Sequence, residues 1–240
     1  MKKLLLPKQH GAWVMVSLPY LIGVIVGGPK WIHLPLFIGW LFIYIASHPL
    51  ILALKQKEKR ADYLRWVIQY LGTAGLFLVY PLLNNPRLLL FGFILLPLFG
   101  MNIFFAKKRK ERAFLNDMSA IIGLCLGGAA SYVVGSGEWN ETMLVIWGAC
   151  ILFFTGSVFF VKTMIREKKN PRFKWLSWGY HGALPVIVFI SGFSLLALTY
   201  VPSVIRAIVC YGKPMAPKHI AIVEFTNSAL FLIGMLIWLY

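Results

Sequence analysis

The feature that most constrains this chain is its series of long apolar runs. Stretches of about 18 or more mostly apolar residues recur along the 240 residues, and a helix of that length crosses the roughly 30 Å of hydrocarbon in a bilayer. Only 13% of the residues are charged, against about 25% in soluble domains. The alternation of polar and apolar residues that marks a membrane β-barrel is absent. The sequence therefore predicts an all-α, polytopic helical membrane protein with a single integral membrane domain, residues 1–240.

Short polar segments divide the apolar runs into about nine predicted transmembrane helices. They are Gly11–Gly28, Ile32–Leu54, Trp66–Leu83, Leu88–Ala106, Asp117–Gly135, Thr142–Val161, Trp175–Gly192, Phe193–Gly212 and Ile220–Tyr240. Residues 175–212 are barely long enough for two spans. Eight spans, with a re-entrant segment at 193–212, is therefore the alternative.

The placement of the basic residues predicts the orientation. The net charge is +16, and 21 of the 24 Lys and Arg residues lie in loops assigned to one side, whereas only Lys30 and Arg87 lie in loops on the other and Arg206 lies within a helix. Basic loops stay in the cytoplasm, so we expect a cytoplasmic N-terminus and a C-terminus outside. The same distribution argues against nucleic acid as a partner, because the charges follow the topology of the membrane.

Polar side chains inside a membrane are costly and are candidates for function. Most of those in this chain fall near the predicted cytoplasmic ends of the helices. The candidate ligand-binding residues are His10, His48, Asn102, Lys108, Arg109, Asn116, Asp117, His181, Arg206, His219 and Glu224. No catalytic residue is assigned.

Each of these residues also has a purely structural interpretation. A histidine at a helix end can be an interfacial anchor, and Asn116 with Asp117 can cap the N-terminus of a helix. Arg206 lies seven residues before Lys213, and Glu224 lies six residues after Lys218. Both are therefore about 10 Å in from the same loop at 1.5 Å per residue, and we predict that they form an ion pair.

Metal binding and hydrolysis have weaker support. No two histidines have the i, i+4 spacing of a helical metal motif, and no CxxC, GxSxG or HExxH is present. We therefore assign no metal ligands and no cofactor, and a haem or metal site built from the histidines is kept only as an alternative.

Three segments carry a resemblance to a known family. They are PKQHGAW at Pro7–Trp13, KKRKERAFLNDMSAIIGLCLGG at Lys107–Gly128, and KPMAPKHIAIVEFTNSALF at Lys213–Phe231. Over essentially its whole length the chain resembles the YwiC-like family of bacterial membrane proteins. That resemblance implies a location in the bacterial plasma membrane and no particular reaction.

A more distant resemblance is to the UbiA superfamily of intramembrane prenyltransferases. It rests on nine helices, large cytoplasmic loops after helices 2 and 6, and a basic cluster after helix 4. The resemblance implies a lipid-open chamber near the cytoplasmic surface, in which two Asp-rich motifs hold Mg²⁺ and a polyprenyl diphosphate.

This chain departs from the UbiA pattern at both Asp-rich motifs. The segment after helix 2 offers only Glu58 and Asp62, and the segment after helix 6 offers only Glu167 among basic residues. Mg²⁺-dependent prenyl transfer is therefore not expected. A basic chamber suits an anionic headgroup that Lys and Arg bind directly.

The predicted function is the binding of an isoprenoid or other anionic lipid-like ligand in a cytoplasm-facing chamber of a UbiA-like scaffold. Three alternatives remain: a small transporter or exporter, a haem- or metal-binding accessory protein of a membrane redox complex, and an assembly role without a small ligand. The sequence indicates neither an oligomeric state nor whether the protein is an enzyme.

Overall fold

The computed structural model describes residues 4–7 and 10–240, which form helices joined by short loops, with no strand among them. The helices are α1 (His10–Gly27), α2 (His33–Lys55), α3 (Arg60–Asn84), α4 (Leu89–Lys107), α5 (Phe114–Ser136), α6 (Glu141–Ile165), α7 (Pro171–Ile190), α8 (Ser194–Thr199), α9 (Val201–Val209) and α10 (Pro217–Leu239). Two 3₁₀ turns, η1 (Lys57–Lys59) and η2 (Pro86–Leu88), precede α3 and α4.

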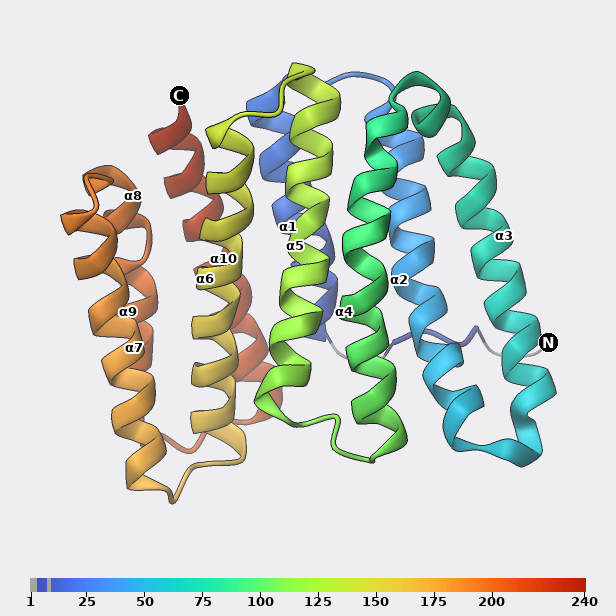
Figure 1. The fold of residues 1–240 in the computed structure, drawn as a ribbon. Coiled ribbons are helices and arrows are strands. Elements are labelled where there is room, and N and C mark those ends of the chain that lie inside the picture. The colour runs from blue at the N-terminus through green and yellow to red at the C-terminus, as the bar shows by residue number, and fades with distance from the viewer. Residues whose placement is uncertain (1–3, 8–9) are drawn as a thin grey trace.

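Six of the described helices are individually long and apolar enough to cross a membrane. They are α2, α3, α4, α5, α6 and α10. Helices α1, α7 and the α8–α9 pair run beside them in the same bundle (Figure 1). Large apolar side chains such as Phe93 and Ile237 point outward and are mostly exposed, as expected for helices that face lipid. The prediction of an all-α polytopic membrane protein is confirmed.

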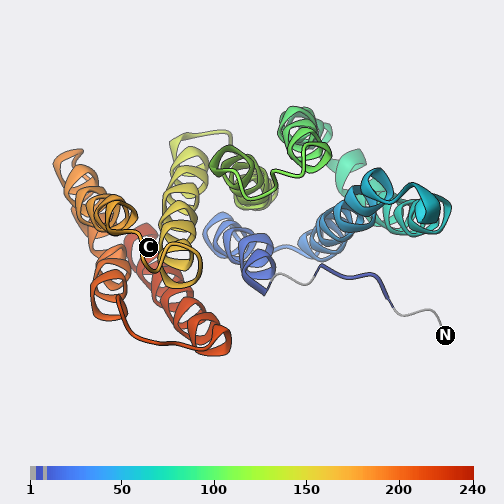
Figure 2. The ribbon, with the colours of Figure 1, turned by 90° about the horizontal axis from the view of Figure 1, so that it is seen from below.

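The centre of the bundle is a close contact between α1 and α5. A Cβ atom added to Gly23 would lie 2.1 Å from the Gly128 carbonyl oxygen, and one added to Gly135 would lie 2.6 Å from the backbone of Gly27. Only glycine lets the two backbones approach this closely, as is common between transmembrane helices. Helices α2, α3 and α4 lie on one side of this pair, and α6 to α10 lie on the other (Figure 2).

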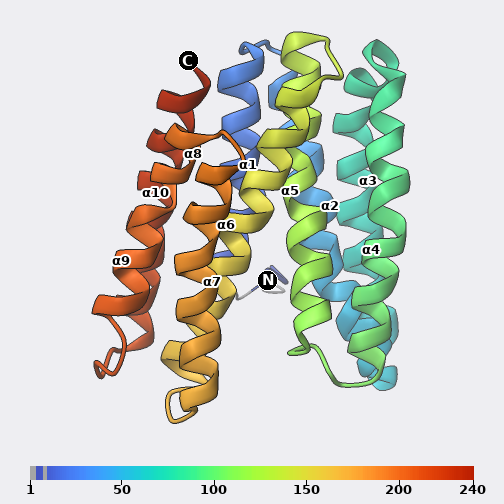
Figure 3. The same ribbon diagram turned by 60° about the vertical axis from the view of Figure 1, so that its left-hand side comes forward.

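The loops sort by charge between the two ends of the bundle. The loops after α2, α4, α6 and α9 gather at one end, whereas the turns after α1, α3, α5 and α7 and the C-terminus lie at the other (Figures 1 and 3). The first end carries the basic segments of the described chain, around residues 55–65, 107–112, 162–174 and 213–218. We call it the basic end.

The predicted helix at Phe193–Gly212 is not continuous. It consists of α8 and α9, which are interrupted at Tyr200, because Pro202 in the first turn of α9 has no amide hydrogen to donate. The pair still runs from the far end of α7 to the basic end, where α10 begins (Figure 3). The structure therefore favours a segment that runs the length of the bundle over a re-entrant segment.

Several predicted helix boundaries also differ from the observed ones, and the starts of α3 and α5 are two of them. Helix α3 begins at Arg60, six residues before the predicted start, since this part of the basic segment holds helix-forming residues and no breaker. Helix α5 begins at Phe114, with Ala113 as its N-cap and no side-chain capping bond. Asn116 and Asp117 therefore lie inside the first turn of α5. They are not its cap, although Asp117 still faces the positive end of the helix dipole.

Candidate functional site

The eleven candidate residues do not converge on one place. His181, Arg206 and Glu224 meet in a buried cluster among α6, α7, α9 and α10. Asn102, Asn116 and Asp117 belong to a second group at the basic end of α4 and α5. The other candidates lie apart from these two groups or outside the described side chains.

Arg206 and Glu224 form the predicted ion pair. The Arg206 Nη1 donates to the Glu224 carboxylate, and the centre of the guanidinium lies 4.3 Å from the Phe160 ring centroid on α6. Arg206 is only 5% exposed. A single charge inside a membrane costs on the order of 3 kcal/mol. The ion pair and the cation–π contact offset this cost, which an unpaired charge would bear in full.

The local fold explains how these two side chains meet. Helices α9 and α10 are antiparallel neighbours joined by a short loop at the basic end, and each charged residue lies a few residues in from that loop. Because the rise per residue is the same on both helices, equal distances from the loop give equal depths in the bundle. The sequence spacing therefore gives Arg206 and Glu224 the same depth, and the packing of α9 against α10 brings the two side chains together.

His181 and Ser157 complete this group, which we call the arginine cluster (Ser157, His181, Arg206 and Glu224). The His181 ring is 2% exposed and lies near enough to Arg206 for a direct electrostatic interaction. The Ser157 hydroxyl lies beside the Glu224 carboxylate. The Nδ1 atom of His181 is 2.7 Å from the Ser177 carbonyl oxygen, so Nδ1 carries the hydrogen and Nε2 is left to bind something else.

The arginine cluster has more hydrogen-bonding capacity than its neighbours use. Arg206 Nε and Nη2 and His181 Nε2 are buried and have no hydrogen-bond partner among the described residues. Buried polar groups in native proteins are almost always paired, and unpaired donors on a charged side chain are costly. Three unpaired nitrogens therefore lie together in this one buried cluster.

A hydrogen-bonded pair extends the cluster away from the basic end. Asn227 Nδ2 donates to Ser203 Oγ at 3.0 Å, and both residues are buried. Ser203 lies three residues before Arg206, and Asn227 lies three residues after Glu224. This pair was not among the residues predicted from the sequence, although its matched spacing from the two charged residues was a usable signal.

A cavity opens between the arginine cluster and the basic end. Its volume is about 220 Å³, and its lining is Thr163, Met164, Lys168, Tyr211, Gly212, Lys213 and Pro214. Phe160, Met164 and Ile220 form an apolar contact at its inner side. Because Phe160 also touches the Arg206 guanidinium, this apolar contact separates the basic cavity from the arginine cluster.

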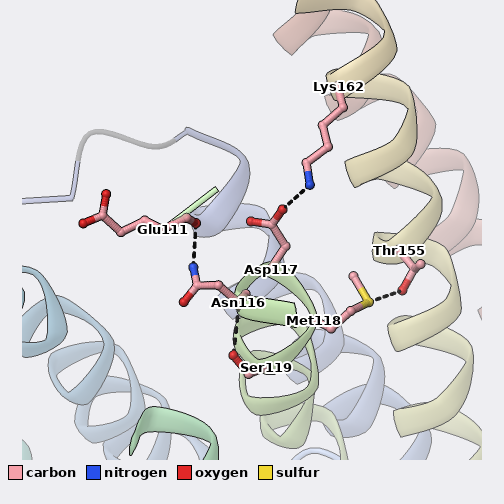
Figure 4. A network of polar contacts seen from close by, with 7 residues as sticks. All are labelled: Glu111, Asn116, Asp117, Met118, Ser119, Thr155 and Lys162. Atoms are coloured by element: carbon pink, nitrogen blue, oxygen red, sulfur yellow. Dashed lines mark hydrogen bonds and ion pairs between the residues drawn. The ribbon is translucent and has the colours of Figure 1, made fainter. Parts of the chain in front are cut away.

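The second polar group ties helices together at the basic end (Figure 4). The Asp117 carboxylate lies 2.6 Å from Lys162 Nζ on α6, and Asn116 Nδ2 donates to the backbone oxygen of Glu111 at 2.7 Å. The Glu111 side chain forms an ion pair with Lys55 at the end of α2. These contacts join α5 to α6 and join the loop between α4 and α5 to the end of α2.

Asn102 belongs to the same group. Its Nδ2 donates to Ser119 Oγ at 3.0 Å and to the Leu98 carbonyl at 2.8 Å, and the Ser119 hydroxyl donates to the Asn116 carbonyl at 2.9 Å. Its carboxylates are used in ion pairs within the protein, although Asn116 Oδ1 is buried without a hydrogen-bond partner among the described residues. We therefore assign it a structural role.

Most of the remaining candidates are exposed or lie at helix ends. Lys108 and Arg109 are exposed at the end of α4, where Lys108 Nζ lies 4.3 Å from the Phe104 ring centroid. His219 is exposed in the first turn of α10, and His48 is partly buried on α2. His10 begins α1, but its side chain lies outside the described part of the structure.

The described residues contain no group of three or more His, Cys, Asp or Glu side chains placed to hold a metal ion. In that part of the chain the histidines that a shared metal or haem site would need are separated: His181 lies in the arginine cluster, and His219 lies exposed on α10.

Two related proteins match this chain over almost its whole length. The "Uncharacterized protein YwiC" of Bacillus subtilis (strain 168) is 41% identical over 237 residues, which cover 99% of each chain. An "Uncharacterized protein" of Haemophilus influenzae is 34% identical over 235 residues, or 98% of each chain. No solved structure matches. The model of the family described as "YwiC-like protein" matches residues 6–132, and the chain therefore belongs to the YwiC-like family.

Proposed function

We propose that this protein binds an anionic, lipid-like ligand from the cytoplasmic leaflet of a bacterial plasma membrane. The observation that carries the proposal is Arg206, whose Nε and Nη2 are buried and unpaired beside the unpaired Nε2 of His181. A phosphate or carboxylate group fits this arrangement, because a guanidinium binds two oxygens of such a group through parallel hydrogen bonds.

His181 adds a second contact suited to an acidic headgroup. Its Nδ1 is committed to the Ser177 carbonyl, so the neutral ring accepts a hydrogen bond at Nε2 from a protonated acid oxygen. The protonated ring donates instead to an ionised oxygen. The ligand's acidic group is thus held by the arginine on one side and the imidazole on the other.

The orientation of the protein follows from the basic end. The basic loops and the cavity lined by Lys168 and Lys213 lie at this end of the bundle, and short basic loops remain in the cytoplasm. We therefore assign the basic end to the cytoplasm and Tyr240 to the outside. The two lysines attract anions from the inner leaflet, whose lipids are partly anionic, toward the arginine cluster.

The scaffold that we propose is UbiA-like, with α1 between the two sets of helices on either side of it. The positions that would carry Asp-rich motifs hold few carboxylates: Asp62 lies 3.9 Å from Arg65, and Glu167 accepts from Asn170 at 2.8 Å. Direct binding of an anion by Arg, His and Lys therefore suits this chain better than Mg²⁺-dependent prenyl transfer.

Native mass spectrometry of the protein purified in a mild detergent tests the proposal. We expect the wild type to carry an anionic lipid-like adduct. The R206M/E224L double variant removes both charges together, which avoids an uncompensated buried charge, and its elution profile reports whether it is folded. Loss of the anion contacts is expected to reduce the adduct by about tenfold or more.

The matched control is R87M, which removes an exposed arginine at the opposite end of the bundle. We expect R87M to keep the adduct. A wild-type protein without any anionic adduct, or a folded R206M/E224L variant that retains it, would overturn the proposal.

A further inference from the structure

The outer parts of α8, α9 and α10 enclose an apolar groove that the proposed function does not use. Its volume is about 280 Å³, and its lining is Leu195, Leu198, Thr199, Pro202, Leu230, Ile233, Gly234, Ile237 and Trp238. Several of these side chains, including Leu198 at 62% and Ile237 at 69%, are exposed. In a membrane-spanning bundle the groove therefore opens to the hydrocarbon of the bilayer.

Gly234 determines the shape of the groove. A Cβ atom at this position would lie 2.8 Å from Thr199 Cγ2, so glycine lets α10 touch the end of α8 there. Side chains on either side of this contact form the walls. At the end farthest from the basic end, the Phe193 and Trp238 rings meet edge to face, with centroids 5.9 Å apart.

The groove is aligned with the arginine cluster along α9 and α10. Pro202 lies four residues before Arg206 on α9, and residues four apart lie above one another on one face of a helix. On α10 the groove residue Leu230 follows Asn227 by three residues, and Asn227 follows Glu224 by three. The Ser203–Asn227 hydrogen bond therefore lies between the unpaired nitrogens of Arg206 and the groove.

We infer that the groove holds the hydrocarbon chain of the ligand whose acidic group binds Arg206. This inference rests on the proposed function and names the ligand class as an amphiphile with one anionic headgroup and one long alkyl or isoprenoid chain. Eleven residues separate Leu195 from Arg206, and fourteen separate Glu224 from Trp238. At 1.5 Å per residue these stretches correspond to a chain of roughly 16–21 Å.

The headgroup must supply most of the affinity. A chain that leaves lipid for an apolar groove gains little from the hydrophobic effect, because lipid tails are as apolar as the groove. The groove contributes close packing against fixed walls, and the contact with Arg206 decides whether a chain stays there. Occupancy of the groove is therefore expected to depend on the arginine.

A photoreactive probe tests this dependence. Hexadecyl phosphate with a diazirine in the outer third of its chain is added to the protein in lipid nanodiscs, irradiated, and its attachment sites are mapped by peptide mass spectrometry. We expect labels in residues 195–202 and 230–238. The R206M/E224L variant is expected to lower this labelling by about tenfold or more, and the same diazirine on uncharged hexadecanol is expected to show no preference for the groove.

Two tryptophan variants test the groove independently of the headgroup site. L198W fills the groove at a lipid-exposed position, and I187W places the same ring at a similarly exposed position on α7 (62% and 61% exposed). We expect labelling of the groove to fall several-fold in L198W and to persist in I187W.

Equal labelling by the alcohol, or no effect of L198W, would overturn the groove assignment. Labelling that requires Arg206 but maps to other helices would also overturn it and would leave the proposed function standing. Labelling that is unchanged in R206M/E224L would contradict both the groove assignment and the proposed function.

Discussion

Arg206 of α9 and Glu224 of α10 form an ion pair that uses only part of the guanidinium. Nη1 binds the carboxylate, whereas Nε and Nη2 stay buried without a partner among the described residues. A pair that served only to neutralise two charges would be most stable with all of these donors satisfied. The unused nitrogens are the groups that the proposed ligand would bind.

The first prediction concerns the coupling of the two charges. R206M and E224Q each leave a buried polar or charged partner uncompensated, and each is expected to destabilise the protein by roughly 3–5 kcal/mol. The R206M/E224L double variant is expected to recover part of this loss. Yield of monodisperse protein and thermal unfolding in detergent measure the effect. A double variant as unstable as the sum of the two single variants would show that the residues are not coupled.

The second prediction concerns the free nitrogen of His181. A Cβ atom on Gly156 would lie 3.2 Å from His181 Nε2, so G156A crowds this nitrogen without removing any polar group. We expect G156A to reduce the anionic adduct several-fold. The control is G148A on the same helix, where an added Cβ meets nothing within 4 Å. Equal amounts of adduct in both variants would show that His181 is not part of the binding site.

The third prediction concerns the contact between α1 and α5. In G23A the new Cβ would lie 2.1 Å from the Gly128 carbonyl oxygen, so the two helices must separate, at a cost of about 2 kcal/mol or more. G100A on α4 has open space around it and is expected to be neutral or slightly stabilising. Unfolding temperatures of the two variants provide the comparison, and a stable G23A would contradict the packing.

The fourth prediction concerns topology. In a background without Cys125, Cys150 and Cys210, we expect a cysteine at Lys110 to react with a membrane-impermeant maleimide only when the cytoplasmic side is accessible. A cysteine at Tyr240, which is 83% exposed, is expected to react in intact cells. Labelling of both positions from the same side would contradict the proposed orientation and an odd number of crossings.

The sequence located most helices because long apolar runs and basic loops mark where a chain enters and leaves a membrane. It also predicted the Arg206–Glu224 pair, since depth in the bundle can be counted from the loop between them. The break at Tyr200 was less visible. The surrounding segment is largely apolar, and only Pro202 marks the break.

Which candidates share a site could not be predicted from the sequence. A helix such as α10 is apolar on nearly every face, so its sequence does not indicate which face turns toward the protein. The rotation of each helix is set by close packing, as at Gly23 and Gly128. In the folded protein Asn102, Asn116 and Asp117 lie in one group, and His181, Arg206 and Glu224 lie in another.

The most direct test of the account is an experimental structure of the wild-type protein in nanodiscs that retain native lipid. The account predicts non-protein density that contacts Arg206 Nε and Nη2 and His181 Nε2 and continues past Ser203 into the groove beside Gly234. Density in which side chains or water alone satisfy the Arg206 nitrogens, with an empty arginine cluster, would contradict it.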